Sequence, residues 1–179
     1  MTFVDDPTDL VRNTPEHSLG HPDASVTLTE FGEFECPHCG RAYYQLKGLR
    51  DRLVELDVRL VWRHLARDDV HPFSTRAAVA AEAAGAQGLF WEMHDLLFEH
   101  QHSLEYEDLR RHATAVGLDV DRFLRDMADP RYVEIVRAHG AEADRLGIDS
   151  TPSFLLNGER YTGDYDMDSL VAAIERERA

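Results

Sequence analysis

Hydrophobic and polar residues alternate in short stretches near the start and the end of the chain. Residues 25–31 alternate valine and leucine with threonine, which predicts a half-buried strand, and the apolar run 58–65 predicts a second, buried one. Residues 153–156 and 159–161 predict two more strands. They flank Asn157-Gly158, a dipeptide typical of tight hairpin turns.

Apolar positions recur with helical spacing through most of the remaining sequence. The segments with this pattern are 40–53, 74–86, 89–100, 104–116, a short stretch that Asp119 or Asp121 can cap, 132–146 and 166–176. The order strand, helix, strand over residues 25–65 predicts a right-handed crossover between parallel strands. Residues 1–24 are polar and predict irregular structure, with a short helix near 7–12.

The only two cysteines stand where the first strand meets the first helix, in Cys36-Pro37-His38-Cys39. Unpaired backbone N–H groups and the positive end of the helix dipole would favour a thiolate at Cys36. Pro37 suits the first helical position, and His38 can add a donor or a positive charge. Cys39 lies one turn further on, within reach of Cys36. The motif predicts thiol–disulfide exchange, with Cys36 as nucleophile and Cys39 resolving the mixed disulfide.

Two other positions could serve this chemistry. Glu30 falls on an apolar strand face, where burial would raise its pKa, and it could then take the proton from Cys39 directly or through a water. The alternative is a solvated glutamate at a strand end. Pro152 directly precedes a strand, and a cis Thr151–Pro152 bond would turn a backbone edge toward Cys36 for an extended peptide to pair with. The alternative is a trans-proline loop.

Composition narrows the range of partners. The chain has 179 residues and a formal net charge of −15, which argues against nucleic acid and anionic membranes as partners. No stretch is apolar enough to enter a membrane as a spanning segment. Residues 1–20 lack the apolar segment of a signal peptide, so we expect a cytoplasmic protein, or an exported one if the sequence is a trimmed form.

Three segments in this order resemble the DsbA-like thiol–disulfide oxidoreductases. Residues 29–39 resemble the active-site segment, 86–95 the helical domain, and 147–158 the cis-proline loop with its hairpin. The resemblance runs from about residue 19 to the end of the chain. It implies an α/β, thioredoxin-like fold with an α-helical insertion domain between the second strand and the cis-proline loop. The expected parts are a lead-in 1–24, a thioredoxin-like domain 25–71 and 147–179, and an inserted domain 72–146.

The resemblance also implies roles for individual residues. Cys36 would be the exposed nucleophile and Cys39 the buried resolving thiol, with His38 stabilising the Cys36 thiolate. Glu30 matches the family's buried acid. The substrate-contacting loop corresponds to Thr151 and Pro152.

Partners would be protein or peptide thiols and disulfides, together with a redox partner that recycles the cysteine pair. No bound cofactor is needed, because the cysteines are the redox groups. The Pro-His pair between the cysteines points to an oxidant, whereas Thr151 before Pro152 is more similar to reductases and isomerases. An exported protein would donate disulfides, and the alternative is a cytosolic disulfide reductase or isomerase. Glu33 and Glu35 would oppose a low pKa at Cys36 unless they face solvent.

Three other functions remain to be weighed. A metal site would need Cys36, Cys39 and histidines as ligands, but no second pair is spaced to complete it, so we predict none. A non-catalytic, chaperone-like module could use the same fold to bind peptides. A glutathione-dependent isomerase would usually lack the counterpart of Cys39.

Overall fold

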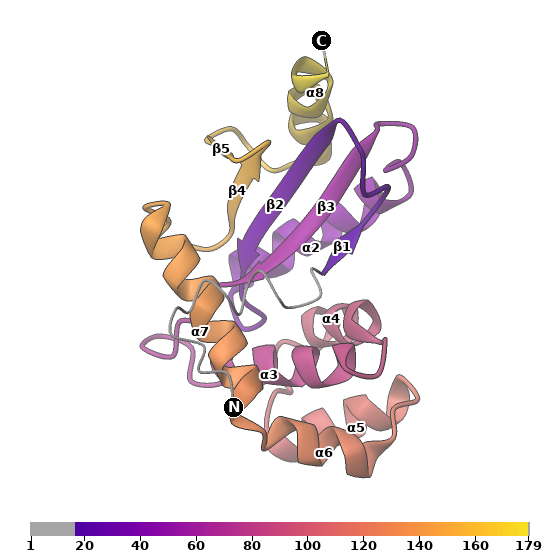
Figure 1. The fold of residues 1–179 in the computed structure, drawn as a ribbon, viewed down its shortest axis with the longest axis vertical. Coiled ribbons are helices and arrows are strands. Elements are labelled where there is room, and N and C mark those ends of the chain that lie inside the picture. The colour runs from indigo at the N-terminus through magenta and orange to yellow at the C-terminus, as the bar shows by residue number, and fades with distance from the viewer. Residues whose placement is uncertain (1–16, 179) are drawn as a thin grey trace, which may run out of the picture.

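The computed structural model describes residues 17–178, and the short helix expected near 7–12 lies outside them. Within that part of the chain, five strands form one sheet in the order β1-β3-β2-β4-β5 (Figure 1). β2 runs parallel to β3, and the other neighbours are antiparallel. The strands are β1 (Ser18–Leu19), β2 (Val26–Gly32), β3 (Val58–His64), β4 (Ser153–Leu156) and β5 (Glu159–Tyr161).

Seven helices accompany the sheet in residues 17–178, one for each helical segment of the sequence pattern. They are α2 (Pro37–Arg50), α3 (Ser74–Gly85), α4 (Phe90–Glu99), α5 (Tyr106–Ala115), α6 (Val120–Met127), α7 (Pro130–Arg145) and α8 (Met167–Glu177). α2 connects β2 to β3, so the predicted crossover between parallel strands is confirmed. Asp119, one of the two candidate caps, accepts a hydrogen bond from Arg122 N at the start of α6.

Two boundaries differ from the sequence expectation. β1 lies in the lead-in that was expected to be irregular, where Ser18 and Leu19 pair with the outer edge of β3. Two residues are too few to show an alternating pattern, so the sequence alone could not indicate this strand. It is defined by its pairing with the edge of β3. α2 begins at Pro37 and ends at Arg50, because Pro37 can begin a helix without losing a hydrogen bond, and Leu53 lies in the turn beyond it.

The two faces of the sheet are covered by different helices. α2 and α8 pack on one face, where Leu28, Leu46 and Ile174 belong to the same buried apolar cluster. On the other face Phe31 packs with Ala143 of α7. Burying such side chains contributes roughly 1.5–3 kcal/mol each, which is the main force holding the layers together.

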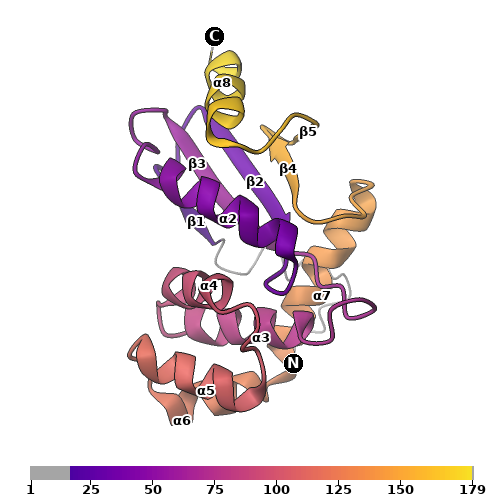
Figure 2. The same cartoon turned by 180° about the vertical axis from the view of Figure 1, so that it is seen from behind.

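α3, α4, α5 and α6 form a separate group of helices at one end of the sheet (Figure 2). They follow β3 and precede β4 in the chain, as expected for an insertion. α7 belongs to both parts, because Tyr132 and Ile135 pack against α3 whereas Ala143 packs on the sheet. The helical part is therefore joined to the sheet by a continuous helix.

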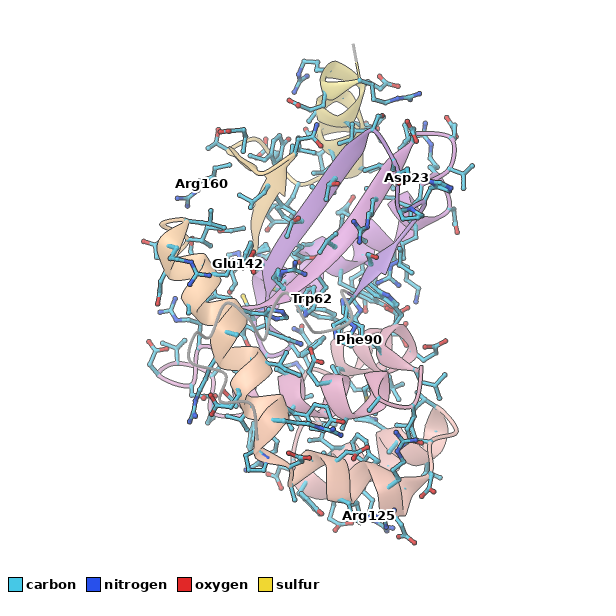
Figure 3. All side chains as sticks on the ribbon, in the orientation of Figure 1. Asp23, Trp62, Phe90, Arg125, Glu142 and Arg160 are labelled. Atoms are coloured by element: carbon cyan, nitrogen blue, oxygen red, sulfur yellow. The ribbon has the colours of Figure 1, made fainter. Side chains whose placement is uncertain are left out.

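An aromatic cluster fills the junction between the helical part and the sheet, where Trp62 and Phe90 are labelled in Figure 3. Phe34, directly after β2, lies 5.2 Å from the Trp62 ring and 5.0 Å from the Phe98 ring of α4. Such pairs are worth about 0.5–1.5 kcal/mol beyond their burial. The segment that carries the cysteines is therefore held between the sheet and α4.

Candidate active site

The turn between β2 and α2 places Cys36 at the helix entrance. Cys36 is the N-cap residue, with extended backbone, and its carbonyl oxygen accepts a hydrogen bond from Gly40 N at 3.0 Å. Pro37 occupies the first helical turn, as predicted. The Cys36 side chain is therefore next to backbone N–H groups that have no partner inside the helix.

The environment of Cys36 favours the thiolate. A hydrogen bond from the Cys39 thiol is the main cause that lowers the pKa of Cys36 to about 4, with help from Thr151 and the backbone amides of Cys39 and His38, while burial acts in the opposite direction. Its sulfur lies 3.7 Å from the Thr151 carbonyl oxygen. The residue is only 4% exposed, so the expectation of an exposed nucleophile is wrong, because the surrounding chain packs over Cys36 and leaves little of it open.

The environment of Cys39 favours the protonated thiol instead. It is fully buried, and burial raises its pKa well above the ordinary value, together with the hydrogen bond to Cys36 and the negative charge of Glu30. Both cysteines are free thiols in this structure. Of the two sulfurs, only Cys36 is suited to be a nucleophile at neutral pH.

Glu30 lies on the buried face of β2, with 3% of the residue exposed. Burial raises its pKa to about 8, although the positive charge of Arg50 lowers it, and the Cys36 charge adds to the rise. A carboxyl with such a pKa can gain or lose a proton near neutral pH. Its charge also acts on the Cys39 thiol, so the two groups are electrostatically coupled.

The loop before β4 faces the thiols. The Thr151–Pro152 bond is cis, as the sequence predicted, and Thr151 presents its carbonyl oxygen to Cys36. Ser153, the first residue of β4, donates from Oγ to Ser150 O at 2.7 Å and closes the loop. Thr151 and Pro152 are half-buried, so part of this loop is open to a substrate.

The imidazole of His38 is exposed and pairs with a neighbour on its own helix. Its Nδ1 lies 2.6 Å from Arg41 Nη2. The effect of His38 on the pKa of Cys36 comes from its backbone amide. The part expected of the imidazole itself, stabilising the thiolate, stays a prediction.

Gln101 was not singled out from the sequence. It lies in the turn after α4, and its side-chain Nε2 donates to Phe34 O at 2.8 Å and to Cys36 O at 2.9 Å. A Cβ atom at position 40 would clash with this amide, which explains the glycine there. Because the two acceptors are backbone oxygens 67 and 65 residues away from Gln101, no motif could have revealed the contact.

Glu33 and Glu35 do not weaken the thiolate in the way the sequence suggested. Glu33 is buried rather than solvent-facing, and it accepts hydrogen bonds from Ser74 Oγ at 2.7 Å and Glu35 N at 3.1 Å, besides pairing with His71. Glu35 accepts from Phe73 N at 2.8 Å. Both acids bind the start of α3, and the pKa of Cys36 is still lowered.

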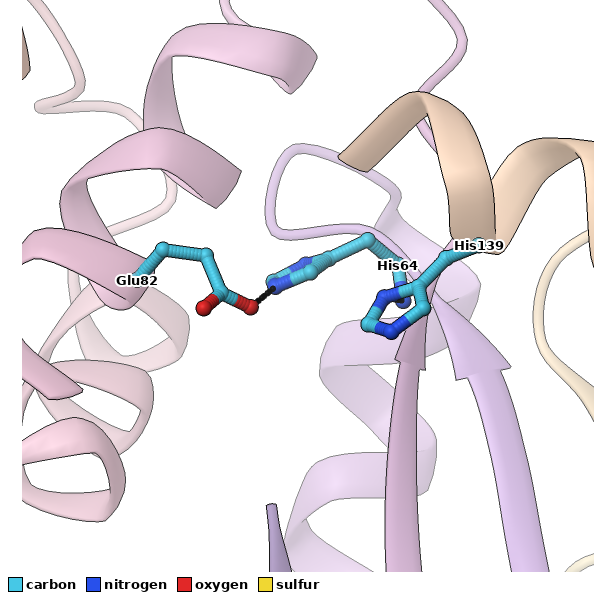
Figure 4. Close-up of side chains that lie close together, drawn as sticks. All are labelled: His64, Glu82 and His139. Carbon is cyan, nitrogen blue, oxygen red and sulfur yellow. Dashed lines mark hydrogen bonds and ion pairs between the residues drawn. The ribbon is translucent and has the colours of Figure 1, made fainter. Parts of the chain in front are cut away.

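A buried cluster of His64, Glu82 and His139 has the composition of a metal site (Figure 4). The hydrogen bonds argue otherwise. Trp62 Nε1 can only donate, and it lies 3.1 Å from His64 Nδ1, so His64 carries its proton on Nε2 and donates it to Glu82 Oε1 at 3.0 Å. To bind a metal through Nε2, His64 would have to carry its proton on Nδ1, where it would point at the N–H of Trp62 and leave two donors facing each other. This cluster instead joins β3, α3 and α7.

The fold and the site together define a thioredoxin-like protein with a helical insertion, in which two closely spaced cysteines lie next to a cis-proline loop. Residues 12–176 match the family model described as Thioredoxin, and the chain belongs to this family. Solved structures of proteins named DsbA share this fold, so the expected resemblance is confirmed at the level of the fold.

Three solved structures illustrate the likeness. A thioredoxin-like oxidoreductase from Silicibacter pomeroyi DSS-3 is 33% identical, with a TM-score of 0.82 over 95% of this chain and 96% of that one. BdbD from Bacillus subtilis is 22% identical, with a TM-score of 0.79 over 90% and 92%. The alpha-DsbA2 protein of Wolbachia pipientis is 18% identical, with a TM-score of 0.81 over 94% and 90%. The last two show the shared fold alone.

The curated relatives are longer proteins. A Na(+)/H(+) antiporter NhaA 3 of Salinispora tropica is 45% identical over 160 residues, which are 89% of this chain and 24% of that protein. A Na(+)/H(+) antiporter NhaA 1 of Mycobacterium sp. (strain KMS) is 41% identical over 165 residues, 91% of this chain and 27% of that one. The chain thus spans about a quarter of the length of these relatives. None of the helices in residues 17–178 is long and apolar enough to cross a membrane.

Proposed function

We propose that this chain exchanges disulfides with protein substrates through Cys36 and Cys39. The proposal rests on the pKa values of the two thiols, which are shifted in opposite directions. The pKa of Cys36 is lowered to about 4, whereas that of Cys39 is raised well above its ordinary value. A stable thiolate at Cys36 makes this sulfur a good nucleophile in the reduced form and a good leaving group from a mixed disulfide.

The steps of the exchange follow from this difference. In the disulfide form, a substrate thiolate attacks the Cys36 sulfur, the bond to Cys39 breaks, and Cys39 leaves as a thiolate that takes a proton from Glu30. A second substrate thiolate then attacks the substrate sulfur of the mixed disulfide. The substrate gains a disulfide, and Cys36 is released as its stable thiolate. In the reverse direction Glu30 accepts the proton of Cys39, which then attacks Cys36.

The loop of Thr151 and Pro152 would hold the substrate. An extended peptide there could pair with the backbone edge next to Cys36, and this places its cysteine close to the reactive sulfur. The acceptor that fits is an unfolded or flexible protein segment. A separate redox partner would restore the disulfide between Cys36 and Cys39 after each cycle.

The stabilised thiolate favours the reduced form of this protein and so favours donation of disulfides over reduction or isomerisation. Donation requires an oxidising compartment. One solved neighbour is described as a periplasmic thioredoxin-like protein from Salmonella enterica serovar Typhimurium, at 18% identity. We therefore favour an exported setting over the cytoplasmic one that the sequence suggested.

Trapping of mixed disulfides tests the proposal. Cys39→Ser leaves the nucleophile in place but removes the thiol that resolves the intermediate, so it should accumulate substrate adducts that a reducing agent releases. Cys36→Ser is the matched control and should form none. If neither variant forms adducts with a reporter peptide that carries a disulfide, redox catalysis is the wrong function. Peptide binding that survives Cys36→Ser would then favour a chaperone-like module.

A further inference from the structure

A small cavity lies next to Glu30. Its walls come from the sheet, from α2 and from α4, and include Glu30, Arg50, Trp62, Trp91 and His94. The volume is about 10 Å³, which is room for about one water. Glu30 is thus next to a space that reaches from the sheet toward the inserted helices.

Three polar atoms of the residues around this cavity have no hydrogen-bond partner within the described part of the chain. They are Glu30 Oε1, Arg50 Nε and His94 Nε2. Glu30 and His94 are each only 3% exposed, so bulk solvent cannot satisfy them. Leaving buried polar groups unsatisfied is costly, and a water with three partners of this kind is typical of buried waters in proteins.

The hydrogen bonds of His94 determine which nitrogen faces the cavity with a lone pair. Nδ1 lies 2.9 Å from Asp95 Oδ1, an acceptor, so Nδ1 carries the proton. The longer 3.3 Å contact of Arg50 Nη2 with the same nitrogen is then not a hydrogen bond. His94 Nε2 is therefore an acceptor, as a water next to Glu30 requires.

The other ring nitrogen of His94, Nδ1, contacts Asp95, which is partly exposed at the surface. Arg50 Nη1 donates to both carboxylate oxygens of Asp95, at 2.8 and 2.9 Å, which fixes the carboxylate against the imidazole. The Asp95 side chain is 27% exposed. The contacts of His94 therefore extend from a buried cavity to an ion pair that water can reach.

We propose that the cavity binds one water, and that this water, His94 and Asp95 carry to solvent the proton that Glu30 takes from Cys39. This inference rests on the proposed function. Glu30 passes the proton to the water, the water gives one to His94 Nε2, and His94 Nδ1 releases its own to Asp95, which passes it to solvent. One proton enters and one leaves, and the reverse sequence delivers a proton when Cys39 is the leaving group.

His94 stays neutral between transfers, mainly because it is buried. Burial is the main cause that lowers the pKa of His94 to about 4, with Arg50 acting in the same direction and Asp95 against it. Tyr43 of α2 also lines the cavity, but its hydroxyl donates to Glu99 at 2.9 Å. The proton therefore passes through His94 and does not rest there.

Rapid mixing of the reduced protein with oxidised glutathione separates the two steps of the reaction. The first is attack by Cys36, and the second is attack by Cys39, which releases the bound glutathione. His94→Phe keeps an aromatic ring in the cluster and removes both nitrogens. We expect it to slow the second step at least tenfold at pH 7 and to leave the first unchanged, whereas a merely structural defect would slow both.

Two further variants complete the test. Asp95→Asn keeps the size of a partly exposed side chain but cannot accept the proton, so it should also slow the second step alone. This variant tests the relay even if His94→Phe fails to fold. His112→Phe is the matched control, because His112 is a buried histidine on α5 whose Nε2 contacts Ser103 O at 2.9 Å, and it should leave both steps unchanged.

A normal second step in Asp95→Asn and in a folded His94→Phe would overturn the proposed relay, as would an equal slowing in His112→Phe. If the wild-type protein shows no reaction with glutathione at all, the proposed function itself is wrong.

Discussion

The side-chain amide of Gln101 donates a hydrogen bond to the carbonyl oxygen of Cys36, at 2.9 Å. The same Nε2 holds Phe34 O at 2.8 Å, so one side chain from the inserted helices binds both ends of the turn that leads to the nucleophile. The backbone of Cys36 is therefore fixed from outside its own strand and helix. This contact ties the position of the reactive sulfur to the packing of the helical part on the sheet.

Gln101→Ala should loosen this turn. Two lost hydrogen bonds predict a fall of about 1–3 kcal/mol in the free energy of unfolding, and a rise in the pKa of Cys36 because its amide donors become less well placed. Chemical denaturation and the pH dependence of thiolate absorbance measure the two effects.

Gln87→Ala is the matched control for Gln101→Ala. Gln87 also binds a backbone turn with both ends of its amide, at Asp119 O and N, but this turn precedes α6 and does not carry the thiols. It should lower stability by a similar amount and leave the pKa of Cys36 unchanged. An unchanged thiolate titration in both variants would show that Gln101 does not position Cys36.

Alkylation should reveal the difference between the two thiols. With its pKa lowered to about 4, Cys36 should react with iodoacetamide at half its maximal rate near pH 4, whereas an unperturbed cysteine needs about pH 8.5. Cys39 should stay unmodified in the folded protein, because it is buried and its pKa is raised. Mass spectrometry of peptides from the alkylated wild-type protein assigns each rate to its cysteine, and leaves the hydrogen bond between the two thiols in place. A Cys36 that titrates near pH 8.5 would refute the thiolate argument.

Glu30 should make the reduced protein less stable as the pH rises. Its folded pKa is raised from 4.5 to about 8, so the folded state binds more protons than the unfolded state between these values. Its contribution is therefore fully present below about pH 4.5 and is lost as the pH rises through 8, at about 1.4 kcal/mol per pH unit in between.

Glu30→Gln removes this titration. The stability of the variant relative to wild type should therefore increase from pH 5 to pH 8, by a few kcal/mol in total. Denaturant midpoints at several pH values provide the comparison, with Glu55→Gln as a control at an exposed glutamate. A constant difference between Glu30→Gln and wild type across this range would mean that Glu30 has an ordinary pKa.

His38 should act on the thiolate through its ring if the resemblance carries over to this position. His38→Ala would then raise the pKa of Cys36 and make the reduction potential of the pair more negative, by about 30 mV for each 1.4 kcal/mol of lost thiolate stabilisation. Arg41→Met is a useful companion, because it frees the imidazole from its 2.6 Å contact while leaving the ring in place. Equilibration with a glutathione buffer gives both potentials, and an unchanged value in His38→Ala would exclude the imidazole from the mechanism.

Local chemistry explains why so much of the framework could be predicted. Alternation marked β2, helical spacing marked α2, and Cys36-Pro37 marked the junction between them, because strand faces, helix faces and helix starts depend on residues close together in the chain. Asn157 and Gly158 likewise predicted a turn, and both residues adopt positive φ there. From these segments the sequence by itself determined the fold class and the place of the cysteine pair.

Tertiary structure decided how the pair is supported. Gln101 on the turn of Cys36, Ser74 on Glu33, and the cavity that joins Glu30 to His94 all bring together residues far apart in the chain. Both acceptors of Gln101 are backbone oxygens, which every residue carries, so no residue pattern identifies them. Burial has the same origin, because the pKa of Glu30 depends on what the folded chain packs around it, and only the complete packing decides that.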